Sequence, residues 1–320
     1  MTGSNILNTF LRCLHTAVPS AWKSVKWLLK LMIPISLVVT LMDYWGVLEW
    51  LASYLNPIFV YIGLPGSSAV IFMSGAAAGT YAGIAAMMSV PLTMKQATII
   101  GCMIALCHAL PMECAVNKKT GSSFWRMAVI RIIMAFVCAV ALNVVLSDDQ
   151  TRYIYIGVSS DASFVALMKT WIISQIQMSF IVFVIVYSLM VVQRLIEAYS
   201  LLVPLSRLFS PLMAVFGLPR NTAYMWLVGN VLGISYGSAV MVELEDKGLI
   251  SKEEANDVNY HLIMNHSLLE DTIVFSVAGI SALCLVTVRV VSALIMVWGR
   301  RLLNIVSGKM RRHTLVKLKR

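Results

Sequence analysis

Two groups of ionisable residues lie inside apolar segments of the chain. The first is Cys107-His108-Ala109-Leu110-Pro111-Met112-Glu113, and the second is Asn265-His266-Ser267-Leu268-Leu269-Glu270-Asp271-Thr272. Ionisable side chains at membrane depth are costly, and by default they mark a transport pathway or a binding site. Histidine titrates near neutral pH and a carboxylate supplies the counter-charge. We therefore predict a site that takes up protons or another cation, formed by His108, Glu113, Asn265, His266, Glu270 and Asp271.

Two other interpretations of these groups stay open at this point. The polar side chains could form static hydrogen bonds that hold two parts of the protein together. Cys107, His108, Glu113 and Cys114 have metal-ligand chemistry, but their spacing matches no known metal motif. We therefore assign no metal ligand and no cofactor from the sequence. The segment predicted to carry His266 also places Glu270 one helical turn away, on the same face.

Two glycine-spaced segments, 66–90 and 220–243, carry further polar residues. Gly75, Gly79 and Gly83 recur every fourth position in the first, which is typical of tight helix packing. The polar side chains around these glycines could meet a ligand at the tip of a hairpin. The predicted substrate-binding residues are Thr80, Tyr81, Asn230, Ser235 and Tyr236.

Two arginines, Arg131 and Arg289, lie within apolar runs. They are expected either to pair with a carboxylate of the other half of the chain or to hold an anionic group. Extension of the side chains to the lipid headgroups is an equally good explanation.

The composition places these residues in a membrane. Of the 320 residues, 59% are hydrophobic and 12% are charged, and the mean hydropathy is +0.82, whereas soluble domains carry about 25% charge. The apolar residues form long runs that do not alternate, so a porin-type barrel is excluded. The formal charge of +10 falls between these runs, and no soluble segment is long enough to read nucleic acid. The fold class is an all-α polytopic membrane protein.

About six full spans and two re-entrant hairpins are expected. The spans are 25–43, 96–115, 125–147, 168–193, 257–275 and 277–299, each close to the 20 residues that cross a bilayer. The hairpins are 66–90 and 220–243. With this topology, 20 of the 25 Lys and Arg residues lie on the inner side, as the positive-inside rule requires. We expect a multi-pass protein of the cytoplasmic (inner) membrane with both termini in the cytoplasm.

The chain contains an internal repeat. An offset of 154 aligns Gly63-Leu64-Pro65 with Gly217-Leu218-Pro219, and nine of the 33 positions from 51 to 83 are identical. An offset of 158 then aligns His108 with His266 and Arg131 with Arg289. Each half has an odd number of crossings, so the second half is inverted. The predicted regions are an interfacial segment 1–24, a first repeat 25–147, an external connection 148–165, a second repeat 166–299 and a basic cytoplasmic tail 300–320.

The G-L-P triplet before a glycine-spaced hairpin, with C-H-A-L-P-M-E and N-H-S-L-L-E-D-T, resembles the Gate, or nucleoside-recognition, family. The resemblance covers nearly the whole chain as two Gate-like units. That family is similar to spore maturation membrane proteins, to the membrane part of ferrous-iron permeases and, distantly, to concentrative nucleoside transporters. The resemblance implies a hairpin-and-span fold. It implies no ligand residue, because the chain lacks the substrate motifs and the GTP-binding module of those relatives.

The expected function is secondary transport of a small polar solute, such as a nucleoside or related metabolite, coupled to protons or a cation. The alternatives are a divalent-metal permease and a non-transporting membrane scaffold or sensor. An enzyme is not expected, because His266, Ser267 and Glu270 lie within one predicted helix, where neighbouring side chains point apart. The expected partners are the solute, the coupling ion and anionic lipid at the basic tail. The oligomeric state, a homo-oligomer included, is left open.

Overall fold

The computed structural model describes residues 3–153 and 163–306, with no strand among them. These residues are almost entirely helical, and the described part of the chain contains no sheet against which the helices could pack. In chain order the helices are α1 (Gly3–Tyr44), α2 (Val47–Phe59), η1 (Val60–Ile62), α3 (Ser68–Ala78), α4 (Thr80–Met88), α5 (Met94–Leu106), α6 (Leu110–Lys119), α7 (Phe124–Val145), α8 (Phe164–Ala198), α9 (Leu202–Val215), η2 (Arg220–Thr222), α10 (Ala223–Val231), α11 (Ile234–Asp246), α12 (Lys252–Asn265), α13 (Leu268–Val277) and α14 (Ala282–Val306). The predicted all-α class is confirmed.

The order of helices from α1 to α7 recurs from α8 to α14, in the register of the sequence repeat. Helices α4 and α11 start at Thr80 and Ile234, which the offset of 154 relates. Helices α6 and α13 start at Leu110 and Leu268, and here the offset is 158. Equivalent sequence positions therefore occupy equivalent places in each half.

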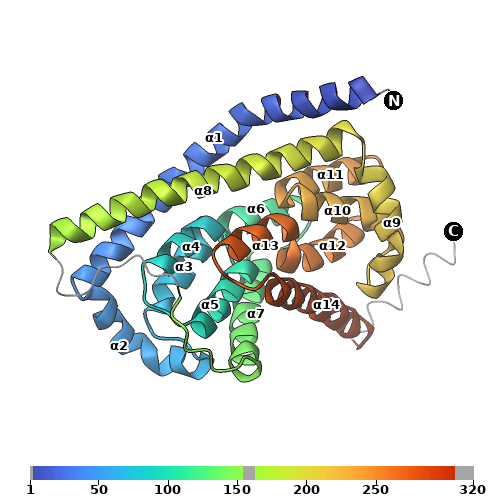
Figure 1. The fold of residues 1–320 in the computed structure, drawn as a ribbon. Coiled ribbons are helices and arrows are strands. Elements are labelled where there is room, and N and C mark those ends of the chain that lie inside the picture. The colour runs from blue at the N-terminus through green and yellow to red at the C-terminus, as the bar shows by residue number, and fades with distance from the viewer. Residues whose placement is uncertain (1–2, 154–162, 307–320) are drawn as a thin grey trace.

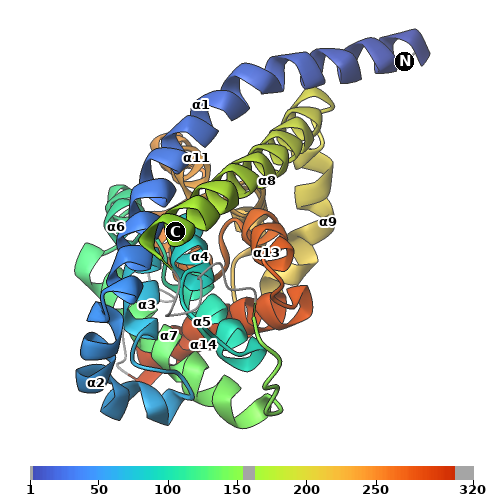
Figure 2. The ribbon, with the colours of Figure 1, turned by 60° about the vertical axis from the view of Figure 1, so that its left-hand side comes forward.

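Helices α1 and α8 form a long antiparallel pair that lies across one side of the bundle (Figures 1 and 2). Near one end of the pair the ring of Tyr44 meets that of Phe164, and further along Trp22 meets Phe183. At 42 residues, α1 is about 63 Å long at 1.5 Å per residue. It runs without a break through residue 24, where the sequence suggested that an interfacial segment ends.

The two glycine-spaced segments fold into helical hairpins. Helix α3 ends and α4 begins at Gly79, whose φ of 106° suits only glycine. A Cβ added to Gly83 would lie 3.1 Å from the Cα of Gly75, so the two helices pack backbone to backbone. Gly233 makes the same turn between α10 and α11, with a φ of 93°.

The segments that carry the histidines are broken helices. Helix α5 ends before Cys107 and α6 begins at Leu110, with Ala109 in the left-handed region at φ 44°. Helix α12 ends at Asn265 and α13 begins at Leu268, with Ser267 at φ 51°. The prediction that His266 and Glu270 share one helix face is therefore wrong. Pro111 stands in the first turn of α6, and the second break has no proline, so such a break does not require one.

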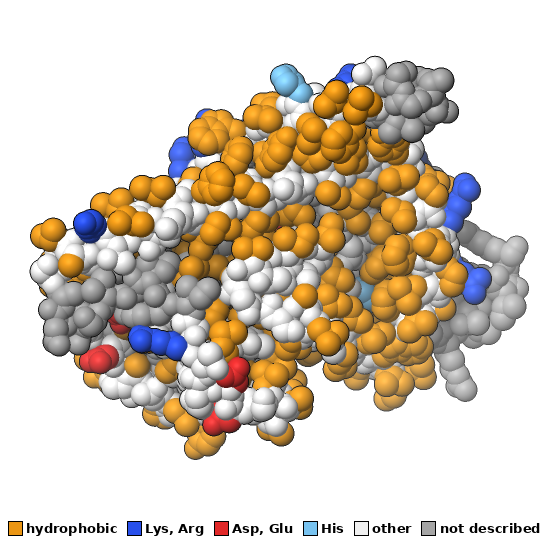
Figure 3. All heavy atoms as spheres, in the orientation of Figure 1, with side chains coloured by type: hydrophobic (Ala, Val, Ile, Leu, Met, Phe, Trp, Pro, Cys, Tyr) orange, Lys and Arg blue, Asp and Glu red, His pale blue; other side chains and the backbone are white. Residues whose placement is uncertain are grey.

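Five helical segments of the described chain are long and apolar enough to cross a membrane: Leu7–Tyr44, Met94–Lys119, Phe124–Val145, Phe164–Ala198 and Ala282–Val306. The sixth expected span, 257–275, falls on α12 and α13. It does not meet this condition, because it carries many polar residues, among them Asn259, His261 and Asn265. Hydrophobic side chains cover most of the face shown in Figure 3, and charged side chains stand near its edges. Such a surface suits contact with lipid.

The connection after α7 is tied to the start of α5. The N–H of Met94 donates to Thr151 O at 2.7 Å, and the N–H of Tyr153 donates to Leu92 O at 2.9 Å. The Tyr153 hydroxyl donates to Ala278 O at 2.6 Å and so reaches the end of α13. Half of the expected connection 148–165 and most of the tail 300–320 lie outside the described residues.

The hairpin contact predicts the effect of a single methyl group. Gly237→Ala should destabilise the protein by about 1–3 kcal/mol, because the new Cβ would lie 2.9 Å from the Cα of Gly229 and force α10 and α11 apart. Gly299→Ala is the matched control, since Gly299 has open space around it within a helix. Thermal unfolding in detergent measures both, and equal midpoints for the two variants would contradict the close packing.

Candidate functional site

Two fully buried arginines organise the centre of the molecule. Arg131 and Arg289 lie on α7 and α14, and neither exposes any surface. The Nε of Arg131 donates to Leu106 O at 2.9 Å, and that of Arg289 donates to Met264 O at 3.1 Å. Each guanidinium thus satisfies a carbonyl at the C-terminal end of a broken helix, where no intrahelical donor remains. Their full burial excludes extension to the headgroups.

The same arginines pair with carboxylates on the helices beyond the breaks. Arg131 donates to Glu113 Oε2, and Arg289 donates to Asp271 Oδ2 at 2.7 Å. Both carboxylates stand in the first turn of a helix, a position that favours negative charge. Each pair lies within one half, so the expectation of a partner carboxylate in the other half is wrong.

The two histidines connect the halves. The Nε2 atoms of His108 and His266 lie 3.2 and 3.1 Å from Glu113 Oε1. His108 Nε2 is also 3.8 Å from Asp271 Oδ2. The ring centroids of the histidines are 5.1 Å apart. Residues more than 150 positions apart in the chain therefore form one buried network of two arginines, two histidines and two carboxylates.

The first hairpin adds hydroxyl groups to this network. Thr80 Oγ1 donates to Asp271 Oδ1 at 3.2 Å, and the Tyr81 hydroxyl donates to Glu270 Oε1 at 3.4 Å. Thr80 and Tyr81 begin α4, directly after the turn at Gly79. Of the residues predicted from the sequence, seven thus meet at the interface of the halves: Thr80, Tyr81, His108, Glu113, His266, Glu270 and Asp271.

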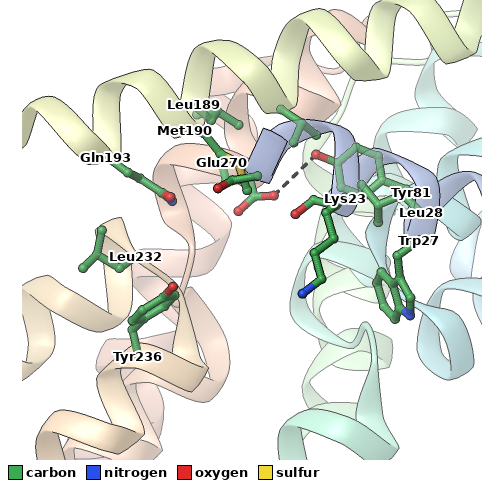
Figure 4. Close-up of a pocket in the computed structure, with 13 residues that line it drawn as sticks. Lys23, Trp27, Leu28, Tyr81, Leu189, Met190, Gln193, Leu232, Tyr236 and Glu270 are labelled. Atoms are coloured by element: carbon green, nitrogen blue, oxygen red, sulfur yellow. Dashed lines mark hydrogen bonds between the residues drawn. The ribbon is translucent and has the colours of Figure 1, made fainter. Parts of the chain in front are cut away.

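A cavity of about 610 Å³ lies between this interface and the pair of long helices. Figure 4 shows the Tyr81–Glu270 hydrogen bond beside it, with Lys23 and Trp27 on one side and Gln193 and Tyr236 on the other. Its volume falls within the range of small-molecule sites. Glu270 is next in the chain to Asp271, so the cavity adjoins the buried network.

Three of the predicted residues lie elsewhere. Asn230 donates to Trp226 O at 3.0 Å within its own helix. The Oδ1 atom of Asn265 lies 3.0 Å from Nδ1 of a further buried histidine, His261. Ser235 is exposed at the start of α11. Among the predicted residues of the second hairpin, Tyr236 lines the cavity, next to Leu232.

The long helices α1 and α8 also line the cavity, and none of their residues is among those predicted from the sequence. Lys23 and Gln193, from α1 and α8, both line it. A signal was present, since each is a polar residue in or beside an apolar run that could have been read as inward-facing. Pattern alone does not tell which face of a long helix meets the protein.

Three atoms of the network could hold a metal ion. Ligand atoms of His108, Glu113 and His266 all lie within 4.8 Å of one another, and all three residues are buried. This group differs from the one weighed from the sequence, because neither Cys107 nor Cys114 belongs to it.

The buried ion pair between Arg131 and Glu113 predicts that removal of the arginine alone greatly lowers the stability of the protein. Arg131→Met should cost about 3–5 kcal/mol, because it leaves Glu113 ionised and short of its partner in a buried site. The double variant Arg131→Met/Glu113→Gln should recover part of this loss, since neither charge remains. Arg126→Met, on the exposed face of the same helix, is the control; it removes only an exposed hydrogen bond to Tyr260 and should cost less than about 1 kcal/mol. Unfolding in detergent followed by circular dichroism measures all three, and a single variant as stable as the control would contradict the role of the pair.

Comparison with known proteins agrees with this architecture. The profile of the Gate family, described as nucleoside recognition, matches residues 25–122. The chain is 29% identical over 276 residues to an uncharacterized membrane protein, YvoD, of Bacillus subtilis (strain 168), and the match covers 83% of this chain and 87% of that protein. No solved structure matches the chain. The protein is thus a helical membrane protein whose residues 25–122 match the Gate family, described as nucleoside recognition.

Proposed function

We propose that the protein is a secondary transporter of a small polar solute, coupled to a proton or another cation bound in the buried network. The observation that carries this proposal is the position of the cavity, which adjoins a network built from both halves of a repeated fold. Secondary transporters bind substrate and ion at the interface of their repeats. A change at the network would alter contacts between the halves, and so the access to the cavity.

We further propose that the two halves have inverted topology, which is the arrangement that this mechanism requires. Helices α1 and α8 are equivalent in the repeat, yet they run antiparallel, with Ser36 bound by Gln175 at 3.0 Å and Tyr44 packed on Phe164. A two-fold axis in the membrane plane relates repeats in this way. In the proposed topology the α3/α4 and α10/α11 hairpins are re-entrant, and their tips at Gly79 and Gly233 face the network from opposite sides.

The solute is proposed from the chemistry of the cavity. Tyr81, Tyr236 and Trp27 supply aromatic faces, and Glu270, Lys23 and Gln193 supply polar groups. Aromatic rings stack on flat heterocycles, and a carboxylate accepts hydrogen bonds from hydroxyl or amino groups. A nucleoside or a related metabolite combines both features and agrees with the description of the Gate family.

The distribution of Lys and Arg supports a cytoplasmic membrane location with both termini inside. This topology predicts that Lys119 and Asp149, both exposed, lie on opposite sides. Cysteines placed at these two positions, in a chain whose six native cysteines are replaced, should react with an impermeant thiol reagent from opposite faces of the membrane. Labelling from the same face would refute the topology.

Transport itself is tested by uptake of labelled nucleosides into proteoliposomes, with a proton or sodium gradient imposed. Tyr236→Phe and Glu270→Gln should weaken solute affinity about tenfold, because each removes a polar group from the cavity wall. Tyr61→Phe is the matched control, since Tyr61 is 83% exposed and lies outside the cavity. If no gradient drives uptake and no solute raises the melting temperature, the scaffold alternative replaces transport.

A further inference from the structure

Three ligand atoms converge at the interface of the halves. Two belong to the first half, His108 Nε2 and Glu113 Oε1, and one belongs to the second, His266 Nε2. Both nitrogens lie within 3.2 Å of the same oxygen. All three side chains are at least nine-tenths buried, so bulk water does not separate them.

In each histidine ring, the contact that Nδ1 makes decides which ring nitrogen carries the proton. Nδ1 of His108 lies 3.0 Å from Ile104 O, and Nδ1 of His266 lies 2.7 Å from Leu262 O. A carbonyl oxygen only accepts hydrogen bonds, so each Nδ1 must carry the proton. In a neutral ring Nε2 then presents its lone pair, and both lone pairs point toward Glu113 Oε1.

Three acceptors that face one another at hydrogen-bond distance need a cation between them. One proton can lie on only one of the two N–O lines and leaves the other contact repulsive. Two protons would make two imidazolium rings with centroids 5.1 Å apart. A divalent ion contacts all three atoms at once and adds the same charge as two protons.

The surrounding charges accept such an ion. With all carboxylates ionised, Glu113, Glu270 and Asp271 oppose Arg131 and Arg289, so the cluster has a net charge of −1, which a divalent ion changes to +1. Asp271 Oδ2 is 3.8 Å from His108 Nε2, near enough to orient a water molecule on the ion. Arg131 holds the far oxygen of Glu113 and leaves Oε1 for the ion.

We propose that His108, Glu113 and His266 bind a divalent transition-metal ion of the Zn²⁺ or Fe²⁺ type. Two imidazoles and one carboxylate are a familiar ligand set for these ions. Metal-bound histidines usually donate their second ring nitrogen to a carbonyl or carboxylate, as both do here. Because the ligands come from both halves, the bound ion ties the halves together. Its role as the coupling cation rests on the proposed function, whereas the binding itself does not.

Titration of the purified protein with Co²⁺, followed by its visible absorption, tests the site. We expect one ion per chain and a raised melting temperature in the parent protein. His266→Gln and His108→Gln should each weaken Co²⁺ binding about 100-fold or more, since loss of an outer-shell partner alone costs roughly 10–100-fold. His15→Gln, at an exposed position, is the matched control. Cys102→Ser is the second control, because its thiol lies 3.9 Å from that of Cys284 and offers another metal site.

Several outcomes would overturn the proposal. They are the absence of stoichiometric Co²⁺ binding, binding that survives His266→Gln, and binding that disappears with Cys102→Ser. If a histidine variant does not fold, X-ray absorption of the parent bound to Co²⁺ decides instead, and fewer than two imidazole ligands refutes the site. If the site fails one of these tests, solute uptake by the metal-free parent would show that the proposed transport does not depend on it.

Discussion

The structure depends on one interaction, the buried arginine that spans a broken helix. A break in an apolar interior leaves carbonyl groups without donors, which is costly where water is absent. Arg131 and Arg289 each donate to such a carbonyl through Nε and to a carboxylate beyond the break through the guanidinium. Charge and hydrogen bonding are thus satisfied together, which is the condition for a stable buried ion pair. The breaks in turn place a histidine where each helix stops.

The hairpins and the breaks support one another. The N–H of Ala109 donates to Gly75 O at 3.0 Å, and the N–H of Ser267 donates to Gly229 O at 3.1 Å. Both donors belong to residues held in the left-handed region, where a non-glycine residue is strained by about 1–3 kcal/mol. The glycine faces let the helices approach closely enough for these bonds. A hairpin that moves would therefore disturb the histidine site directly.

The repeated scaffold holds an asymmetric site. Glu113 meets both histidines, whereas Asp271 meets Thr80 and, more distantly, His108. Helix α11 starts with Ile234 and Ser235 where α4 starts with Thr80 and Tyr81, so the hydroxyl contacts of the first hairpin have no counterpart in the second. The cavity lies on one side of the network, toward α1 and α8. Symmetry thus provides the framework, and the departures from it give the cavity and the network different chemistry.

The sequence by itself determined the all-α membrane class, the repeat register and the identity of the polar residues that meet. These follow from composition, from glycine spacing and from the cost of burying charge, which are local properties. Tertiary structure alone decided the rest. It placed the breaks at Ala109 and Ser267, because a left-handed residue is selected by a bond to a distant glycine carbonyl. It paired each arginine within its own half, and it turned Lys23 toward the cavity, because apolar helices give no local signal of which face meets protein and which meets lipid.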